Sequence, residues 1–92
     1  MTKIKLDQLI WDSWNLIHPS KKHGISSQEV ELAIHNIRAF RYGYAGRVIL
    51  ICSIQNKLIS IIVSKKSGGK YYIVTARPAD RKERKIAYDN EN

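Results

Sequence analysis

The sequence has little of what staples, anchors or disorders a polypeptide. It has one cysteine in 92 residues, Cys52, which excludes an internal disulfide. Two prolines and five glycines are too few for a collagen-like chain or a Pro/Gly-rich disordered chain. No apolar run approaches the roughly 20 residues that a membrane-spanning helix needs. Cys52 itself lies in the apolar run Arg47–Cys52, so we expect it to be a small core residue.

Acidic residues are scarce beside basic ones. The chain has 16 Lys and Arg against 8 Asp and Glu, a formal net charge of +8. Residues 1–46 hold six basic and four acidic residues, and residues 47–92 hold ten and four, so the halves carry +2 and +6. Such an excess indicates a polyanionic partner, either nucleic acid or an acidic protein. The alternative interpretation is solubility alone.

The length and composition favour one small domain. At 92 residues there is room for a single domain, expected over residues 1–92, and 43% hydrophobic residues suffice for a core. The first residues lack the apolar segment of a signal peptide, and a lone buried thiol suits a reducing compartment. We therefore expect a cytoplasmic protein that does not interact with membranes.

Hydrophobic spacing predicts two helices in the first half. Over Leu9–His23 the apolar residues recur at helical intervals, with a kink or a fresh start at Pro19 and a stop at Gly24. The second helix begins with a capping box between Ser26 and Glu29. An apolar stripe follows at helical spacing, formed by Val30, Ala33, Ile34 and Ile37.

Strands and a last helix are predicted in the second half. Apolar, β-branched runs separated by short turns predict strands over 47–54, 58–64 and 70–77, with antiparallel pairing. Residues 41–44 are a candidate fourth strand. Asp80 and Glu83 form a second capping box at the start of the last helix, whose apolar side is thin, so it is either weakly docked or held by a partner. The predicted class is α+β, with two N-terminal helices, an antiparallel sheet of three to four strands and one C-terminal helix.

The titratable residues indicate chemistry without a metal or cofactor. The three histidines lack cysteines or carboxylates at ligand spacing, and Gly68-Gly69 is a turn without the Lys-Ser/Thr pair of a phosphate loop. Basic and polar groups do suffice for cleaving RNA with its own 2′-hydroxyl as nucleophile. The candidate catalytic residues are His18, Lys22, His23 and Arg77. The candidate RNA-binding residues are Arg47, Arg81, Arg84, Lys85 and Tyr88.

Several of these residues also have simpler interpretations. His23 beside Gly24 could terminate a helix, and Lys22 could be a solvated charge. Trp11 and Trp14 are expected in the core more than on a base-stacking surface. The strongest local signal is the convergence of Arg77, Arg81 and Arg84 near one turn, which we interpret as a clamp for phosphate.

Two motifs resemble the BrnT family of bacterial toxins. Trp11-Asp12, followed by Lys22-His23-Gly24-Ile25-Ser26 and Glu29, resembles the opening of these proteins. The segment 72–84, which ends Thr-Ala-Arg and then Arg-x-Glu-Arg, resembles their closing strand and helix. The resemblance spans residues 10–88. The chain departs from the family pattern at Asn15, where a Lys is common, and at Pro19, where an Asn is common.

The resemblance implies a fold and a function. The fold would be RelE-like, with helices packed on a curved antiparallel sheet. The function would be a metal-independent endoribonuclease of a type II toxin–antitoxin system, neutralised by a cognate antitoxin and able to contact operator DNA through it. Lys22, His23 and Glu29, with Arg77, Arg81 and Arg84, occupy signature positions. Two alternatives remain: a non-catalytic RNA- or DNA-binding module, and an inactive relative that binds an acidic antitoxin.

Overall fold

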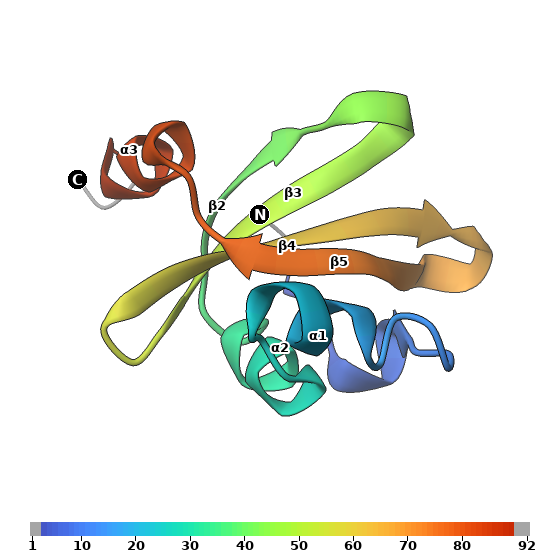
Figure 1. Ribbon diagram of the computed structural model, residues 1–92. Helices are drawn as coiled ribbons and strands as arrows, with labels where there is room; N and C mark the ends of the chain where they lie inside the picture. Colours follow the sequence, from blue (N-terminus) through green and yellow to red (C-terminus); the bar gives the residue numbers. More distant parts are fainter. Residues whose placement is uncertain (1–2, 90–92) are drawn as a thin grey trace.

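The computed structural model describes residues 3–89 and shows an α+β fold over that range (Figure 1). The remaining positions of the expected domain, 1–2 and 90–92, lie outside the described residues. The strands are β1 (Leu9–Ile10), β2 (Ile37–Tyr42), β3 (Arg47–Ile54), β4 (Lys57–Lys66) and β5 (Lys70–Pro78). The α-helices are α1 (His18–His23), α2 (Ser27–Ala33) and α3 (Arg81–Asp89).

The sheet is mixed rather than purely antiparallel. Its described strands follow the order β1-β5-β4-β3-β2, in which β2 to β5 pair antiparallel and β1 runs parallel to β5. The α+β class is confirmed, but the predicted count of three to four antiparallel strands is wrong. The fifth strand, β1, has two residues, with Leu9 opposite Tyr71 and Ile10 opposite Tyr72. A pair this short leaves no alternation of polar and apolar residues for sequence reasoning to detect.

The predicted helix over Leu9–His23 forms only in its last part. α1 begins at His18 with Pro19 in its first turn, where the missing N–H of proline costs nothing. It ends at Gly24, whose φ of 70° is left-handed, so the predicted stop is confirmed. Before His18 the chain forms β1 and a turn, because the side chains of Asp12 and Asn15 hydrogen-bond to backbone groups that a helix would otherwise use.

The predicted capping box at the start of α2 is confirmed. The N–H of Glu29 donates to the Ser26 hydroxyl at 3.1 Å, and the N–H of Ser26 donates to the Glu29 carboxylate, also at 3.1 Å. The helix is shorter than its apolar stripe, however. Ile37 belongs to β2 and lies opposite Cys52, so the last member of the stripe packs from the sheet instead.

The capping box gives a first testable prediction. Ser26→Ala removes the acceptor for the Glu29 N–H, and we expect the free energy of unfolding to fall by about 0.5–2 kcal/mol. Chemical denaturation followed by circular dichroism measures this change. Ser26→Asp keeps an acceptor at the same position and should retain most of the stability. An alanine variant as stable as the wild type would contradict the capping role.

The remaining strand predictions agree with the structure within a few residues. β3 has the predicted bounds, β4 and β5 are slightly longer, and β2 begins at Ile37 rather than at 41. The turn between β3 and β4 includes Gln55 at a positive φ of 54°. Residues 67–69, which include Gly68-Gly69, form a short 3₁₀ turn between β4 and β5, as expected for a hairpin connection.

The two faces of the sheet are covered unequally. In Figure 1, α1 and α2 lie together on one side of β4 and β5, while α3 lies apart from them beyond the end of β5. The main core lies between the sheet and α2, and includes Val30, Leu50, Ile61 and Ile73. Cys52 is in this core, as predicted, and burial raises the pKa of its thiol to about 12. The thiol is therefore a packing group rather than a nucleophile.

The last helix covers part of the second face. Ala87 is buried and Ile86 half-buried, and they pack against a small cluster with Ala39, Ile51 and Ala79. The thin apolar side predicted from the sequence is thus docked on the sheet. Among residues 3–89, no helix is both long enough and apolar enough to cross a membrane.

Candidate nucleic-acid interface

The structure places the four candidate catalytic residues on α1 and β5, two elements that pack against each other. His18 begins α1, Lys22 and His23 lie in its last turn, and Arg77 is near the end of β5, the strand on which α1 packs. The rings of His18 and His23 meet edge to face, with centroids 6.5 Å apart and an interplanar angle of 82°. We call these four residues the histidine cluster. The position of Arg77 relative to α1 could not be predicted from the sequence, because Arg77 is far from the other three residues along the chain.

The histidine cluster shifts the titration of His23. Burial lowers the pKa of His23 below its ordinary value of 6.5, and the positive charges of Lys22, His18 and Arg77 lower it further. An imidazole with a lowered pKa is mostly neutral at pH 7 and has a nitrogen that can accept a proton. His23 therefore ends α1, as the simpler interpretation held, and is also suited to act as a base.

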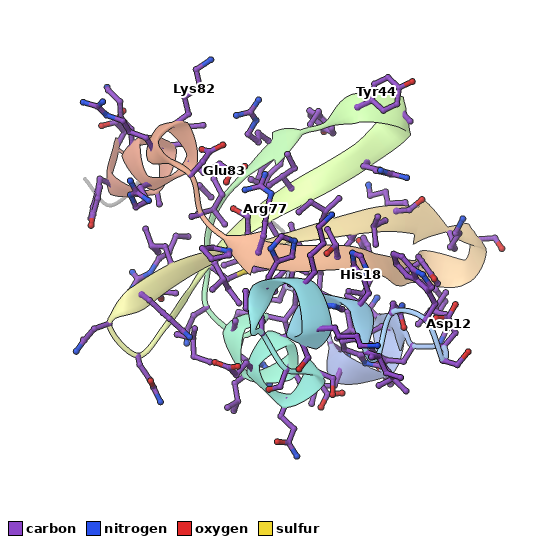
Figure 2. The ribbon with its side chains drawn as sticks, viewed as in Figure 1. Asp12, His18, Tyr44, Arg77, Lys82 and Glu83 are labelled. Atoms are coloured by element: carbon purple, nitrogen blue, oxygen red, sulfur yellow. The ribbon has the colours of Figure 1, made fainter. Side chains whose placement is uncertain are left out.

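Arg77 is not free to act as the expected phosphate clamp. Its two terminal nitrogens donate to the two carboxylate oxygens of Glu83, both at 2.7 Å. The Glu83 side chain is 1% exposed and that of Arg77 is 30% exposed. These hydrogen bonds raise the pKa of Arg77 and balance its charge. Figure 2 shows the Arg77 side chain directed at Glu83.

Glu83 is held by three further groups besides Arg77. The Ser60 hydroxyl donates to its Oε1 at 2.8 Å and the N–H of Asp80 donates at 2.9 Å, while the Glu83 N–H donates to the Asp80 carboxylate at 2.8 Å. Burial would raise the pKa of Glu83, but the hydrogen bonds from Arg77, Asp80 and Ser60 outweigh it and lower the pKa to about 2. The predicted second capping box is confirmed.

This network fixes α3 to the sheet. Arg77 and Ser60 are paired across β5 and β4, so their side chains leave the sheet on the same face and meet Glu83 there. The sequence identified Glu83 only as a capping residue. Its role as the partner of Arg77 depends on the β4–β5 register, which no local pattern encodes.

The candidate RNA-binding residues lie away from the α1 members of the histidine cluster, His18, Lys22 and His23. Arg81, Arg84, Lys85 and Tyr88 are exposed on α3, which Figure 1 shows well separated from α1. Arg84 donates to the carbonyl of Ala79 at 2.8 Å, and Lys85 pairs with Asp89 at 3.4 Å. Arg47 is exposed at the start of β3. The predicted convergence of Arg77, Arg81 and Arg84 is therefore replaced by a paired Arg77 with an exposed basic helix beside it.

Sequence reasoning placed Trp14 in the core, and this is wrong. Trp11 is partly buried against the core, whereas the Trp14 side chain is 53% exposed. Its ring stacks on His18, with centroids 4.2 Å apart and an interplanar angle of 15°. Trp14 therefore belongs to the surface beside the histidine cluster. The signal that could have found it was the Trp14-x-x-x-His18 spacing, which places two rings one helical turn apart.

Asn15 holds the segment that carries Trp14. This side chain is fully buried, and its amide donates to the carbonyls of Ile10 and Ile73, both at 2.9 Å. Its oxygen accepts from the N–H of Asp12 at 2.7 Å. Asn15 thus satisfies backbone groups between β1 and β5, and it is a structural residue at a position where the BrnT pattern often has Lys.

The arrangement has the groups needed for acid–base chemistry on a phosphodiester. It offers a neutral imidazole at His23, a second imidazole at His18 and the ammonium of Lys22 beside them. Among residues 3–89, no group of three or more His, Cys, Asp or Glu side chains could hold a metal ion.

Comparisons with known proteins add no relative. No family model matches the chain, and no curated protein or solved structure is similar enough to be matched. The BrnT resemblance therefore rests on the motif residues alone.

Proposed function

We propose that this chain is a metal-independent endoribonuclease that cleaves RNA through attack by the 2′-hydroxyl. The observation that carries the proposal is the environment of His23. Its imidazole has a lowered pKa and lies within the electrostatic reach of Lys22, His18 and Arg77. A neutral base surrounded by cations is the combination that this reaction needs, because a proton is removed while negative charge develops on phosphorus.

Each residue of the histidine cluster has its own role in the proposed reaction. His23 accepts the proton of the 2′-hydroxyl, whose oxygen attacks the adjacent phosphorus. Lys22 stabilises the charge on the non-bridging oxygens, with Arg77 contributing the N–H groups that Glu83 does not use. His18 donates a proton to the departing 5′-oxygen. The products are a 2′,3′-cyclic phosphate and a 5′-hydroxyl.

In the cell, we propose that the chain acts as the toxin of a type II toxin–antitoxin pair with a RelE-like fold. Its net charge of +8 suits an acidic antitoxin as well as RNA, and contact with operator DNA would pass through that antitoxin. The exposed basic residues of α3, Arg81 and Arg84 among them, extend the positive surface beyond the histidine cluster. An RNA strand that passes the end of β5 would reach both.

Expression in a bacterial host tests this proposal. The wild type, induced from a tightly repressed promoter, should arrest growth and degrade total RNA. The double variant His18→Asn/His23→Gln should do neither at equal expression of folded protein. His35→Gln is the matched control, because His35 is an exposed histidine outside the histidine cluster, and it should be as toxic as the wild type. Normal growth and intact RNA with folded wild-type protein would contradict the proposal.

The paired state of Arg77 favours one alternative, a module that binds RNA without cutting it. The hydrogen bonds of Arg77 to Glu83 reduce the charge available to a transition state. This alternative predicts RNA binding with a steep salt dependence and no cleavage products from purified protein.

A further inference from the structure

A stacked pair of rings projects from the surface beside the histidine cluster. The Trp14 and His18 rings are nearly parallel, 15° apart, and Trp14 keeps 53% of its side chain exposed. Leaving a tryptophan of this size in water forfeits the free energy that burial would bring. Its position is therefore set by something other than the packing of the core.

Hydrogen bonds hold the backbone of Trp14 in place. The Asp12 carboxylate accepts from the N–H groups of Trp14 and Asn15 at 3.0 and 2.8 Å, and its other oxygen accepts from the Tyr72 hydroxyl at 2.8 Å. The Trp14 carbonyl accepts from the N–H of His18 at 3.0 Å. With Asn15 fixed between β1 and β5, the turn is tied to the sheet at two points. The ring is thus pre-organised, and a ligand would not have to order it.

A hollow opens next to the stacked pair. It has a volume of about 290 Å³ and is lined by Ser13, Trp14, Ile17, His18 and Lys21. Ligand sites generally start at roughly 300 Å³, so the hollow suits one nucleotide unit rather than a large molecule. Its lining combines the apolar and aromatic side chains of Ile17 and Trp14 with the basic side chain of Lys21, and Lys22 and His23 follow along α1.

We propose that Trp14 and His18 form a stacking platform for one unpaired base of single-stranded RNA, adjacent to the histidine cluster. The base would stack on the exposed part of the Trp14 ring, and Lys21 would contact the neighbouring phosphate. Stacking on a rigid aromatic side chain favours single strands, because the bases of a duplex are already stacked on each other. The platform makes unpaired RNA the substrate class of the site, and to that extent it rests on the proposed function.

Charge decides between RNA and other occupants of this surface. Lys21 lines the hollow and Lys22 and His23 follow on α1, while the Asp12 carboxylate, which accepts from the Trp14 N–H, is occupied by the turn and by Tyr72. A second copy of this chain would bring the same positive charges to the contact. A polyanion with exposed bases matches both the charge and the ring.

Binding of non-cleavable RNA tests the platform. The probes are a short single-stranded RNA carrying 2′-O-methyl groups throughout, which blocks the attacking hydroxyl, and a duplex of the same sequence. Affinities of the full chain are measured by fluorescence anisotropy at one fixed salt concentration. Trp14→Leu should weaken single-strand binding roughly five- to 150-fold and leave duplex binding unchanged. Trp14→Phe should retain most of the affinity, since it keeps a ring.

Tyr44→Leu is the matched control. Tyr44 is 88% exposed, and Figure 2 shows it at the far tip of the β2–β3 hairpin, away from His18. Loss of this ring should leave RNA binding unchanged. Because Trp14 and Tyr44 are both exposed, Trp14→Leu, Trp14→Phe and Tyr44→Leu should all keep the circular dichroism spectrum and melting temperature of the wild type.

Each contrary outcome is distinct. Equal single-strand affinity of Trp14→Leu and the wild type, or equal losses for single strand and duplex, would overturn the platform. The platform would also be overturned if the wild type sedimented as a dimer and Trp14→Leu as a monomer while RNA affinity stayed unchanged. That result would assign the surface to a second copy of the chain. Trp14-dependent binding with no cleavage of unmodified RNA would remove the ribonuclease and keep the platform. Cleavage without Trp14 dependence would remove only the platform.

Discussion

His23→Gln is expected to lower the rate of RNA cleavage by about 10²–10⁴-fold, the range that a positioned general base or acid contributes. Glutamine is polar and similar in size, but it cannot accept the 2′-hydroxyl proton at neutral pH. His23 is half-exposed at the end of α1, so the loss should come without unfolding. Single-turnover cleavage of a labelled RNA in the presence of chelator measures the rate, with His35→Gln as the unaffected control.

The pH profile separates a base from a merely structural histidine. Because burial and neighbouring cations lower the pKa of His23 below 6.5, the neutral form persists below that pH. On the acidic side of the pH profile, the wild-type kcat/KM should therefore fall only when the pH drops through a value below 6.5, and His23→Gln should lack this acidic limb. An acidic limb that lies above pH 6.5, or that survives in His23→Gln, would contradict the assignment of His23.

Glu83→Ala is expected to cost about 2–4 kcal/mol of the free energy of unfolding. Removing one partner of a buried ion pair typically costs about 3–5 kcal/mol, and partial exposure of Arg77 reduces this. The variant also leaves the Ser60 hydroxyl and the Asp80 N–H without their acceptor. At roughly 4–8 °C per kcal/mol, the melting temperature should fall by on the order of 10–30 °C.

An exposed ion pair on the same helix provides the control. Lys85 and Asp89 lie 3.4 Å apart with side chains 79% and 67% exposed, so Lys85→Ala should be as stable as the wild type within experimental error. A stability of Glu83→Ala that matches Lys85→Ala would show that α3 is not anchored through Arg77 and Glu83.

The contribution of Glu83 should also depend on pH. Its pKa is about 2 in the folded chain against an ordinary value of 4.5, so its stabilisation is present above pH 4.5 and disappears as the pH falls toward 2. The difference in unfolding free energy between the wild type and Glu83→Ala should therefore narrow over that interval. Urea denaturation at a series of pH values measures it, and a constant difference would exclude the ion pair as its source.

Local signals in the sequence predicted the fold where a few adjacent residues decide the structure. The capping box at Ser26, the stop at Gly24 and the bounds of β3 are all of this kind. Predictions failed where contacts between residues far apart in the sequence decide the structure. β1 exists because Leu9 pairs with Tyr71, and the helix expected before Pro19 is replaced by a turn because Asn15 reaches the carbonyl of Ile73.

The same distinction applies to the candidate site. His18, Lys22 and His23 could be grouped from the sequence because they share one short helix. Arg77 was correctly placed at the end of a strand, but its pairing with Glu83 depends on how α3 docks. Trp14 was assigned to the core because an apolar residue at helical spacing is usually buried. Its exposure follows from the turn that Asp12 and Asn15 impose, and this appears only in three dimensions.

The ends of the RNA products test the central claim most directly. Purified wild-type chain is incubated with single-stranded RNA in excess chelator, and the products are analysed for their terminal groups. Cleavage by the 2′-hydroxyl predicts 2′,3′-cyclic phosphate and 5′-hydroxyl ends, and resistance of an otherwise identical strand in which every 2′-hydroxyl is replaced by hydrogen. Ends carrying 3′-hydroxyl and 5′-phosphate, or intact RNA in the presence of folded protein, would contradict the account.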